Sequence, residues 1–209
     1  MTDLALNRPA LVRRGLRLNW LTLAYNTVEA VVSVAAGLVA GSVALLGFGV
    51  DSGIEVTASV AAQWRLRVDV DPERRERVER LTRRVIGASF LALAVYVLVD
   101  SLTTLWRREA PEASRLGLVI LVLSVVVMPV LARAKRRVAL ALKSRALEAD
   151  AAQTSLCAYL SVIALAGVGL NAALSWWWAD PVAALVMVPI IAKEGIEGLR
   201  GESDCDCHP

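Results

Sequence analysis

Two acidic side chains, Asp51 and Glu55, lie in the middle of an apolar stretch long enough to cross a lipid bilayer, SVALLGFGVDSGIEVTASVAA. Even on lenient insertion scales, an Asp at bilayer depth costs roughly 2.5–3.5 kcal/mol. Residues four apart share one face of a helix, so the two carboxylates point the same way and can hold one cation. Acids inside membrane segments usually mark ion or proton pathways, which favours a ligand pair over two residues that only hydrogen-bond neighbouring helices.

A second polar face is found in the stretch EADAAQTSLCAYLSVIALAG. Its members follow the helical spacing i, i+3, i+4, i+7 and are Asp150, Gln153, Thr154 and Cys157. At about 1.5 Å per residue, Asp51 and Cys157 both fall near the bilayer midplane, and Glu55 falls level with Gln153.

These two stretches together predict a divalent cation site. Cysteine thiolate suits zinc and similar borderline-soft ions, and carboxylates suit many divalent ions. We therefore expect Asp51, Glu55 and Cys157 to be metal ligands, with Gln153 and Asp150 as auxiliary ones. The alternative for Cys157 is an ordinary buried small side chain.

The bilayer is the expected solvent for this chain. Hydrophobic residues make up 56% of the sequence and the mean hydropathy is +0.55, whereas soluble domains are roughly 45–50% apolar. Six apolar stretches have about the length of a membrane-spanning helix, at residues 18–39, 43–64, 84–106, 115–133, 148–172 and 177–197. The sequence therefore predicts an all-α integral membrane protein with six transmembrane helices in residues 17–200.

The basic residues indicate the orientation of these helices. All but three of the 23 Lys and Arg residues flank one side, in or near the N-terminal tail of residues 1–16, after the second and fourth stretches, and after the sixth. The exceptions are Arg107, Arg108 and Arg115. Basic loops favour the cytoplasm, so both termini are predicted to be cytoplasmic. The net charge of +3 then reflects topology and anionic headgroups, with no need for a nucleic-acid partner.

The C-terminal tail, residues 201–209, reads GESDCDCHP. Cys205, Cys207 and His208 are soft donors, and a reducing cytosol disfavours a stable disulfide between the cysteines. The tail is a candidate accessory metal site, although it lacks the paired ligands of a structural zinc site. A solvated end without a metal is the alternative.

The apolar stretches resemble those of a known transporter family. GLVAGSVALLGFGVDSGIEVTASV resembles the first and second spans of the cation diffusion facilitator family, and EADAAQTSLCAYLSVIAL resembles its fifth span, usually A-D-A-x-H-x-x-x-D. WWADPVAALVMVPIIAKEGIEGLR is similar to the sixth span, which opens with Asp180 and Pro181. The resemblance covers about residues 17–200. It implies a six-helix export domain that usually dimerises and exchanges a cytosolic divalent cation for protons.

The resemblance assigns Asp51 and Glu55 to the two ligand positions of the second span. It places Gln153 at the family's histidine position and Cys157 at its aspartate position, so the usual metal preference does not transfer directly. We expect a short form without the family's cytoplasmic metal-sensing domain. Two more acids lie outside the family motif: Glu29 is deep enough to carry protons or assist the ligands, and Asp100 lies near the outer face.

The sequence thus predicts a divalent cation transporter rather than an enzyme. Zinc efflux from the cytosol across the plasma membrane, by a homodimer with protons as counter-ion, is the expected activity, and Cd²⁺, Co²⁺, Fe²⁺ and Mn²⁺ are the other candidate substrates. The alternatives are a non-transporting metal sensor, an accessory membrane protein, and a transporter of organic cations. An organic cation would call for aromatic side chains beside the acids, and near Asp51 only Phe48 is aromatic. Convergence of Asp51, Glu55 and Cys157 on one cavity would favour the metal transporter.

Overall fold

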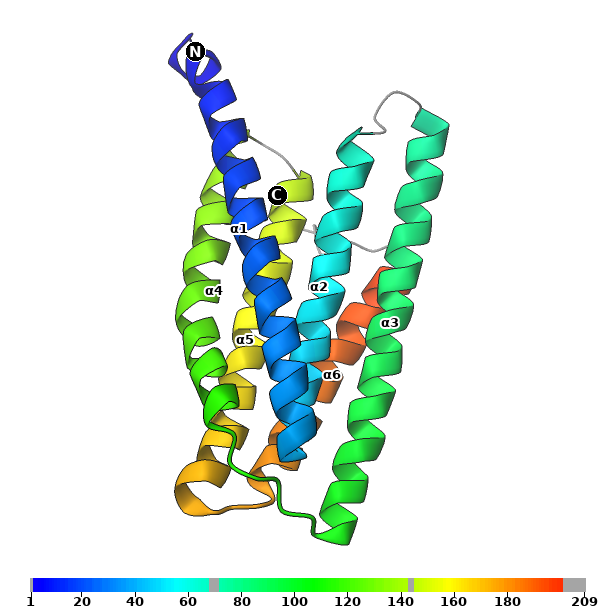
Figure 1. The fold of residues 1–209 in the computed structure, drawn as a ribbon. Helices are drawn as coiled ribbons and strands as arrows, with labels where there is room; N and C mark the ends of the chain where they lie inside the picture. Colours follow the sequence, from blue (N-terminus) through cyan, green and yellow to red (C-terminus); the bar gives the residue numbers. More distant parts are fainter. Residues whose placement is uncertain (1, 68–71, 143–144, 201–209) are drawn as a thin grey trace, which may run out of the picture.

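A computed structural model describes residues 2–67, 72–142 and 145–200, which form a bundle of helices (Figure 1). The described residues form α1 (Thr2–Ala40), α2 (Val43–Arg67), α3 (Pro72–Arg107), α4 (Arg115–Leu142), α5 (Arg145–Leu174) and α6 (Ala179–Arg200). These ranges contain no strand. The predicted all-helical architecture with six helices is confirmed.

Four helices contain segments long and apolar enough to cross a membrane. They are Arg13–Ala40 of α1, Arg84–Arg107 of α3, Arg115–Ala141 of α4 and Asp150–Leu174 of α5. Among the described residues, no such segment is found in α2 or α6, the helices that contain Asp51, Glu55 and Glu194. A membrane crossing by these two helices stays a prediction.

The outward faces of the helices are strongly apolar. Val39 is 83% exposed and Trp106 is 90% exposed, and many other Leu, Val and Trp side chains lie on the same outer surface. Soluble monomers rarely expose contiguous apolar surface of this extent. The surface is that of a membrane protein, whose outer side chains contact lipid.

Several helices extend beyond the apolar stretches read from the sequence. α1 begins at Thr2 instead of near residue 18, α3 begins at Pro72 instead of near residue 84, and α4 continues to Leu142 instead of ending near residue 133. The added turns all contain Arg, and those of α3 also contain Glu; both residue types form helices well in water. Pro72 occupies the first helical position, where its missing N–H costs nothing. Hydropathy marks the apolar part of a helix only, so it misses such polar extensions.

The helices pack most extensively in three pairs, α4 with α5, α3 with α6, and α1 with α2. α2 also contacts α3, α5 and α6, so it lies at the centre of the bundle. α3 and α6 approach at two glycines: a Cβ added to Gly87 would lie 2.8 Å from the carbonyl oxygen of Gly195. Such contacts between small residues are how membrane helices pack without a hydrophobic driving force.

Three connections lie together at one end of the bundle, called here the loop end. They are residues 41–42, 108–114 and 175–178. The N–H of Glu112 donates to the carbonyl of Ala40 at 2.8 Å, and the side-chain amide of Asn171 donates to the carbonyl of Pro111 at 2.9 Å. The charge asymmetry of the sequence predicts that the loop end faces outward.

Asp180, at the start of α6, is bound to the start of α2. Its carboxylate accepts a short hydrogen bond from the Ser42 hydroxyl and one of 3.3 Å from the N–H of Ala44. The Ser42 oxygen in turn accepts the N–H of Leu45 at 3.1 Å, which caps α2. The negative charge of the carboxylate is also stabilised by the positive, N-terminal end of the α2 dipole. Asp180 therefore fixes the first turns of α2 and α6 at the same level.

Candidate metal-binding site

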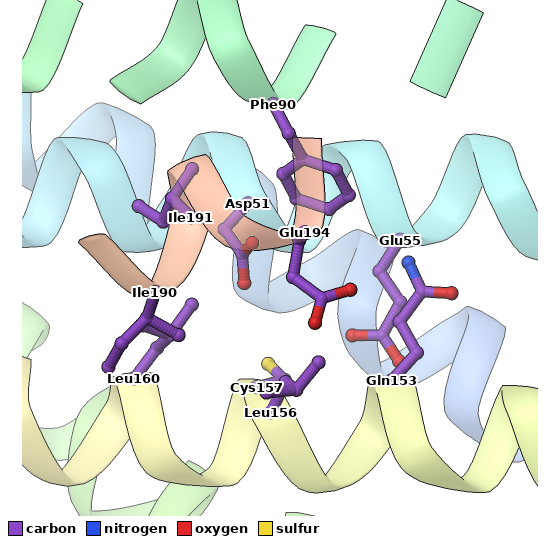
Figure 2. A pocket seen from close by; sticks show the side chains of 10 residues that line it. All are labelled: Asp51, Glu55, Phe90, Gln153, Leu156, Cys157, Leu160, Ile190, Ile191 and Glu194. Atoms are coloured by element: carbon purple, nitrogen blue, oxygen red, sulfur yellow. The ribbon is translucent and has the colours of Figure 1, made fainter. Parts of the chain in front are cut away.

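A small pocket lies inside the bundle between α2, α5 and α6 (Figure 2). It is lined by Asp51, Glu55, Phe90, Gln153, Leu156, Cys157, Leu160, Ile190, Ile191 and Glu194. Its free volume is about 10 Å³, enough for an occupant the size of one water molecule. The pocket therefore suits a single ion and is too small for an organic cation.

Asp51 and Glu55 form the α2 wall of the pocket. They are only 6% and 3% exposed, as expected for residues on the inward face of a central helix. Oε1 of Glu55 accepts the hydroxyl hydrogen of Thr154 at 3.2 Å. Oε2 of Glu55 has no hydrogen-bond partner in the part of the chain that the structure describes. One carboxylate oxygen is thus left for a ligand inside the bundle.

Gln153 and Cys157 form the α5 wall. Both line the pocket, and Cys157 is a free cysteine with only 1% of its surface exposed. Figure 2 shows the Cys157 sulfur directed toward the acids of α2 and α6. The four residues that the family resemblance assigns to ligand positions, Asp51, Glu55, Gln153 and Cys157, therefore all line one pocket.

Glu194 on α6 is the acid that the sequence analysis missed. It lines the pocket from the third wall, and Figure 2 shows its carboxylate between the α2 and α5 side chains. Glu194 lies in the polar segment KEGIE at the end of the sixth apolar stretch, a composition typical of a solvated helix terminus. Helical spacing contained the signal, because Met187, Ile191 and Glu194 follow at i, i+4, i+7 and the first two are buried at 0% and 1%.

Asp150, predicted as an auxiliary ligand, does not line the pocket. Its Oδ2 lies 2.8 Å from the Nζ of Lys135 on α4. The Lys135 ammonium also donates to Thr154 at 3.0 Å, and the Thr154 hydroxyl reaches Glu55. A hydrogen-bonded chain thus joins Lys135 to the acid pair of α2.

Lys135 is buried, although the sequence places it among the basic residues after the fourth apolar stretch, which were expected to flank the membrane. The Lys135 side chain is 1% exposed, because α4 continues past it and Asp150 and Thr154 bind its ammonium. A buried ammonium needs such partners, since taking an unpaired charge out of water is costly.

Glu29 lies behind Cys157, outside the pocket. It is fully buried, its Oε2 accepts the Ser52 hydroxyl at 2.9 Å, and the Cys157 thiol lies 3.7 Å from the same oxygen. Its Oε1 has no hydrogen-bond partner among the described residues, and neither have the hydroxyls of Ser33 and Ser124. Glu29 is therefore part of a polar interior that continues from the pocket toward α1 and α4.

The remaining predicted residues lie elsewhere. Asp100 is on α3, away from the pocket lining. Cys205, Cys207 and His208 lie outside the residues that the structure describes. Within residues 2–67, 72–142 and 145–200, no three His, Cys, Asp or Glu side chains are grouped closely enough to hold a metal ion in this conformation. The acids instead line the pocket from two walls, Asp51 and Glu55 on α2 and Glu194 on α6.

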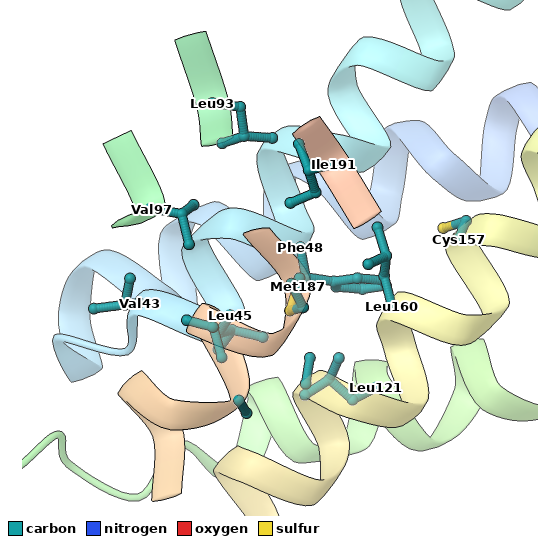
Figure 3. Close-up of a cluster of buried hydrophobic side chains, with 14 of the residues drawn as sticks. Val43, Leu45, Phe48, Leu93, Val97, Leu121, Cys157, Leu160, Met187 and Ile191 are labelled. Atoms are coloured by element: carbon teal, nitrogen blue, oxygen red, sulfur yellow. The ribbon is translucent and has the colours of Figure 1, made fainter. Parts of the chain in front are cut away.

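A packed apolar cluster separates the pocket from the loop end (Figure 3). Leu45, Phe48, Leu121 and Met187 are all fully buried there. Phe48 precedes Asp51 by one helical turn in the direction of the loop end, so the cluster begins where the pocket ends.

Comparison with known proteins identifies the family of the chain. The family model of the cation efflux transmembrane domain matches residues 20–201, which is most of the 209-residue chain. A search of curated proteins gave no match. The matched range contains all of α2 to α6 and the part of α1 that follows residue 19. It therefore includes every residue that lines the pocket. The chain therefore belongs to the cation efflux family, with its transmembrane domain in residues 20–201.

Proposed function

We propose that the protein exports a divalent cation from the cytosol in exchange for protons, with zinc as the first candidate. Family membership supports divalent cation transport in general. The observation that carries the specific proposal is the pocket in the middle of the bundle, where Asp51 and Glu55 of α2 face Cys157 and Gln153 of α5. The donor set of carboxylate, thiol and amide suits zinc, and it also admits Cd²⁺, Co²⁺, Fe²⁺ and Mn²⁺.

Binding in this proposal draws the side chains inward from the separate walls of the pocket. The unpartnered Oε2 of Glu55 and the Cys157 sulfur turn toward the ion, and Gln153 adds an amide oxygen. A divalent ion needs deprotonated ligands, so its arrival displaces protons from the carboxyl and thiol groups that hold them. Exchange of the ion for protons is then built into the site. Glu29, beside the Cys157 thiol, is placed to take up a displaced proton.

The apolar cluster supports an alternating-access cycle. Leu45, Phe48, Leu121 and Met187 are close-packed between the pocket and the loop end, so no hydrated ion passes in this conformation. If the loop end faces outward, the structure is closed to the outside. Transport then requires a rearrangement of helices that opens this cluster and closes the opposite side.

The arrangement in the cell is also part of the proposal. Both termini are placed in the cytoplasm because the basic residues flank that side, and the plasma membrane is the expected location. A homodimer is expected from the family resemblance, and exposed apolar side chains such as Val39 and Trp106 provide surface for a second copy as well as for lipid.

The decisive experiment is metal flux in proteoliposomes. Purified protein is reconstituted with a fluorescent metal indicator inside, and zinc, cadmium, cobalt, iron and manganese are added in turn with and without a proton gradient. We expect zinc flux that depends on protein and is accelerated by an opposing proton gradient. Metal binding without flux would indicate a membrane metal sensor instead. A rate of metal flux that is the same with and without the proton gradient would reject antiport.

A further inference from the structure

We propose that Glu194 of α6 is a direct ligand of the transported cation, so that the site is built by three helices, α2, α5 and α6. The inference rests on the proposed function, since it concerns the same pocket. The sequence motifs place ligands on the second and fifth helices only. The geometry adds a third acid from a helix that these motifs do not use.

The first observation is the position of Glu194. It lines the pocket together with Asp51, Glu55 and Cys157, and Figure 2 shows its carboxylate in the space between them. The neighbours of Glu194 on α6 that also line the pocket, Ile190 and Ile191, offer no polar atom in their side chains.

The second observation is the register of α6 against α2. Asp180 is hydrogen-bonded to Ser42 and to the N–H of Ala44, so both helices start at one level and run in the same direction. Glu55 follows Ala44 by eleven residues and Glu194 follows Asp180 by fourteen, which are rises of about 16 and 21 Å. Figure 1 shows that α6 leans toward α3. A tilted helix advances less along the bundle axis, so the longer rise along α6 corresponds to a smaller difference in depth. Glu194 therefore arrives near the depth of Glu55.

The third observation is independent of Glu194. Glu55 is 3% exposed, and its Oε2 has no hydrogen-bond partner among the described residues. A buried carboxylate oxygen without a partner is costly unless something binds it. The oxygen belongs to a residue that lines the same pocket as Glu194, so one cation in the pocket can bind this oxygen and the Glu194 carboxylate together.

Not every acid on α6 lines the pocket. Glu197 forms an ion pair of 3.3 Å with Lys193, whose side chain is 63% exposed, and neither residue lines the pocket. Glu194 and Glu197 are thus two glutamates on one helix in different settings. Glu197 provides a matched control.

A third carboxylate changes the chemistry of the site. With Asp51, Glu55 and Glu194 the pocket offers three carboxylates and the Gln153 amide against the single thiol of Cys157. Oxygen is then the majority donor, which suits borderline and harder first-row divalent cations such as Mn²⁺, Fe²⁺ and Co²⁺ in addition to zinc. Glu194 also compensates for Gln153, which provides a weaker, neutral donor at its position.

Cobalt(II) titration of the purified protein in lipid nanodiscs tests the proposal, because the visible spectrum of cobalt reports its ligands. We expect Glu194→Gln to weaken cobalt affinity by about ten- to a hundredfold, and to alter the spectrum at saturation. Glu194→Asp keeps the acid but shortens its reach, so it should weaken binding less and still alter the spectrum. Glu197→Gln should match the wild type in both readouts.

Three results would overturn the proposal. Wild-type affinity and spectrum in Glu194→Gln, with binding lost in Glu55→Gln, would remove Glu194 from the site while leaving the proposed function intact. Weaker binding with an unchanged spectrum at saturation would make Glu194 a distant charge and not a ligand. Failure of the wild type itself to bind cobalt or zinc would reject the proposed function, and the ligand role with it.

Discussion

The acids of α2 are buried where apolar side chains would pack at lower cost. Asp51 and Glu55 are 6% and 3% exposed and lie one helical turn apart, and among the described residues neither forms an ion pair with a basic side chain. Two carboxylates this close repel each other when both are ionised. A bound cation removes the repulsion, which explains why such a pair is useful in a transporter.

Neutral replacements of these acids test the pocket. Asp51→Asn and Glu55→Gln keep side-chain shape but remove a charged ligand, so we expect zinc affinity to fall by more than about a hundredfold and flux to be lost. Isothermal titration and proteoliposome flux measure the two effects. Asp100→Asn, an acid on α3 outside the pocket, serves as the control and should transport normally. Wild-type flux in Asp51→Asn or Glu55→Gln would contradict the site.

Cys157 is the residue expected to decide metal preference. Replacing the thiol by a carboxylate in Cys157→Asp should slow cadmium and zinc transport relative to manganese, because sulfur favours softer ions. Relative rates for the three metals, measured in the same vesicle preparation, give the result. Cys157→Ala, which removes the donor without adding one, is the companion variant and should slow all three. Unchanged relative rates in Cys157→Asp would make the cysteine an ordinary packing residue.

At the scale of helices, α4 and α5 are joined by a buried ion pair close to the pocket. Lys135 on α4 and Asp150 on α5 lie 2.8 Å apart, and their side chains are 1% and 21% exposed. Removing one partner of a buried pair costs about 3–5 kcal/mol when the other charge is left without water. The cost here should be lower for the loss of Lys135, since Asp150 retains contact with solvent.

This asymmetry gives a prediction for stability. Asp150→Asn leaves the buried Lys135 ammonium without its negatively charged partner, so it should lower the midpoint of thermal unfolding more than Lys135→Met does. The double variant Lys135→Met/Asp150→Asn should recover part of the loss. Unfolding of detergent-solubilised protein, followed by fluorescence-detected size exclusion, provides the comparison. Equal midpoints for all four proteins would show that the pair contributes nothing to stability.

The helices and the relative depth of their polar residues could be predicted from the sequence. Apolar stretches and the rise of 1.5 Å per residue were sufficient to predict six helices and to bring Asp51, Glu55, Gln153 and Cys157 to one depth. These predictions succeed because they depend on spacing within a helix. Hydropathy alone could not locate the ends of α1, α3 and α4, whose polar turns lie beyond the apolar part.

The residues that were misplaced depend on contacts between helices. From the sequence, Lys135 is only one of the basic residues that follow the fourth apolar stretch, together with Arg136 and Arg137. Only the packing of α4 on α5 brings it to Asp150. Glu194 was missed because its depth depends on where α6 begins relative to α2, and that level is fixed by Asp180. Such tertiary register is absent from a single sequence.

For the whole molecule, the remaining question is how the C-terminal tail relates to transport. Cys205, Cys207 and His208 lie outside the described residues, while the pocket and the six helices precede them. If the tail only collects metal, truncation after Gly201 should leave the maximal rate intact and reduce the initial rate at low free zinc. Collection raises local concentration, which matters only when metal is scarce.

Rate against buffered free zinc, for the full-length and truncated proteins, tests this prediction. Expression and oligomeric state are compared in parallel, so that a folding defect is recognised. Loss of transport at saturating zinc, with both properties unchanged, would make the tail part of the transport machinery.

The hydrogen bonds of Asp180 also limit how α6 can move. They hold its first turn to the start of α2, so any swing of α6 away from α2 has its pivot at the loop end. In a swinging rod, displacement grows with distance from the pivot. Counted from Asp180, Met187 of the apolar cluster lies about 10 Å along α6 and Glu194 about 21 Å. A given rotation of α6 therefore moves Glu194 about twice as far as it moves Met187. Rotation of α6 about its first turn thus displaces the Glu194 carboxylate, the proposed ligand, more than it displaces the side chains that close the path to the loop end.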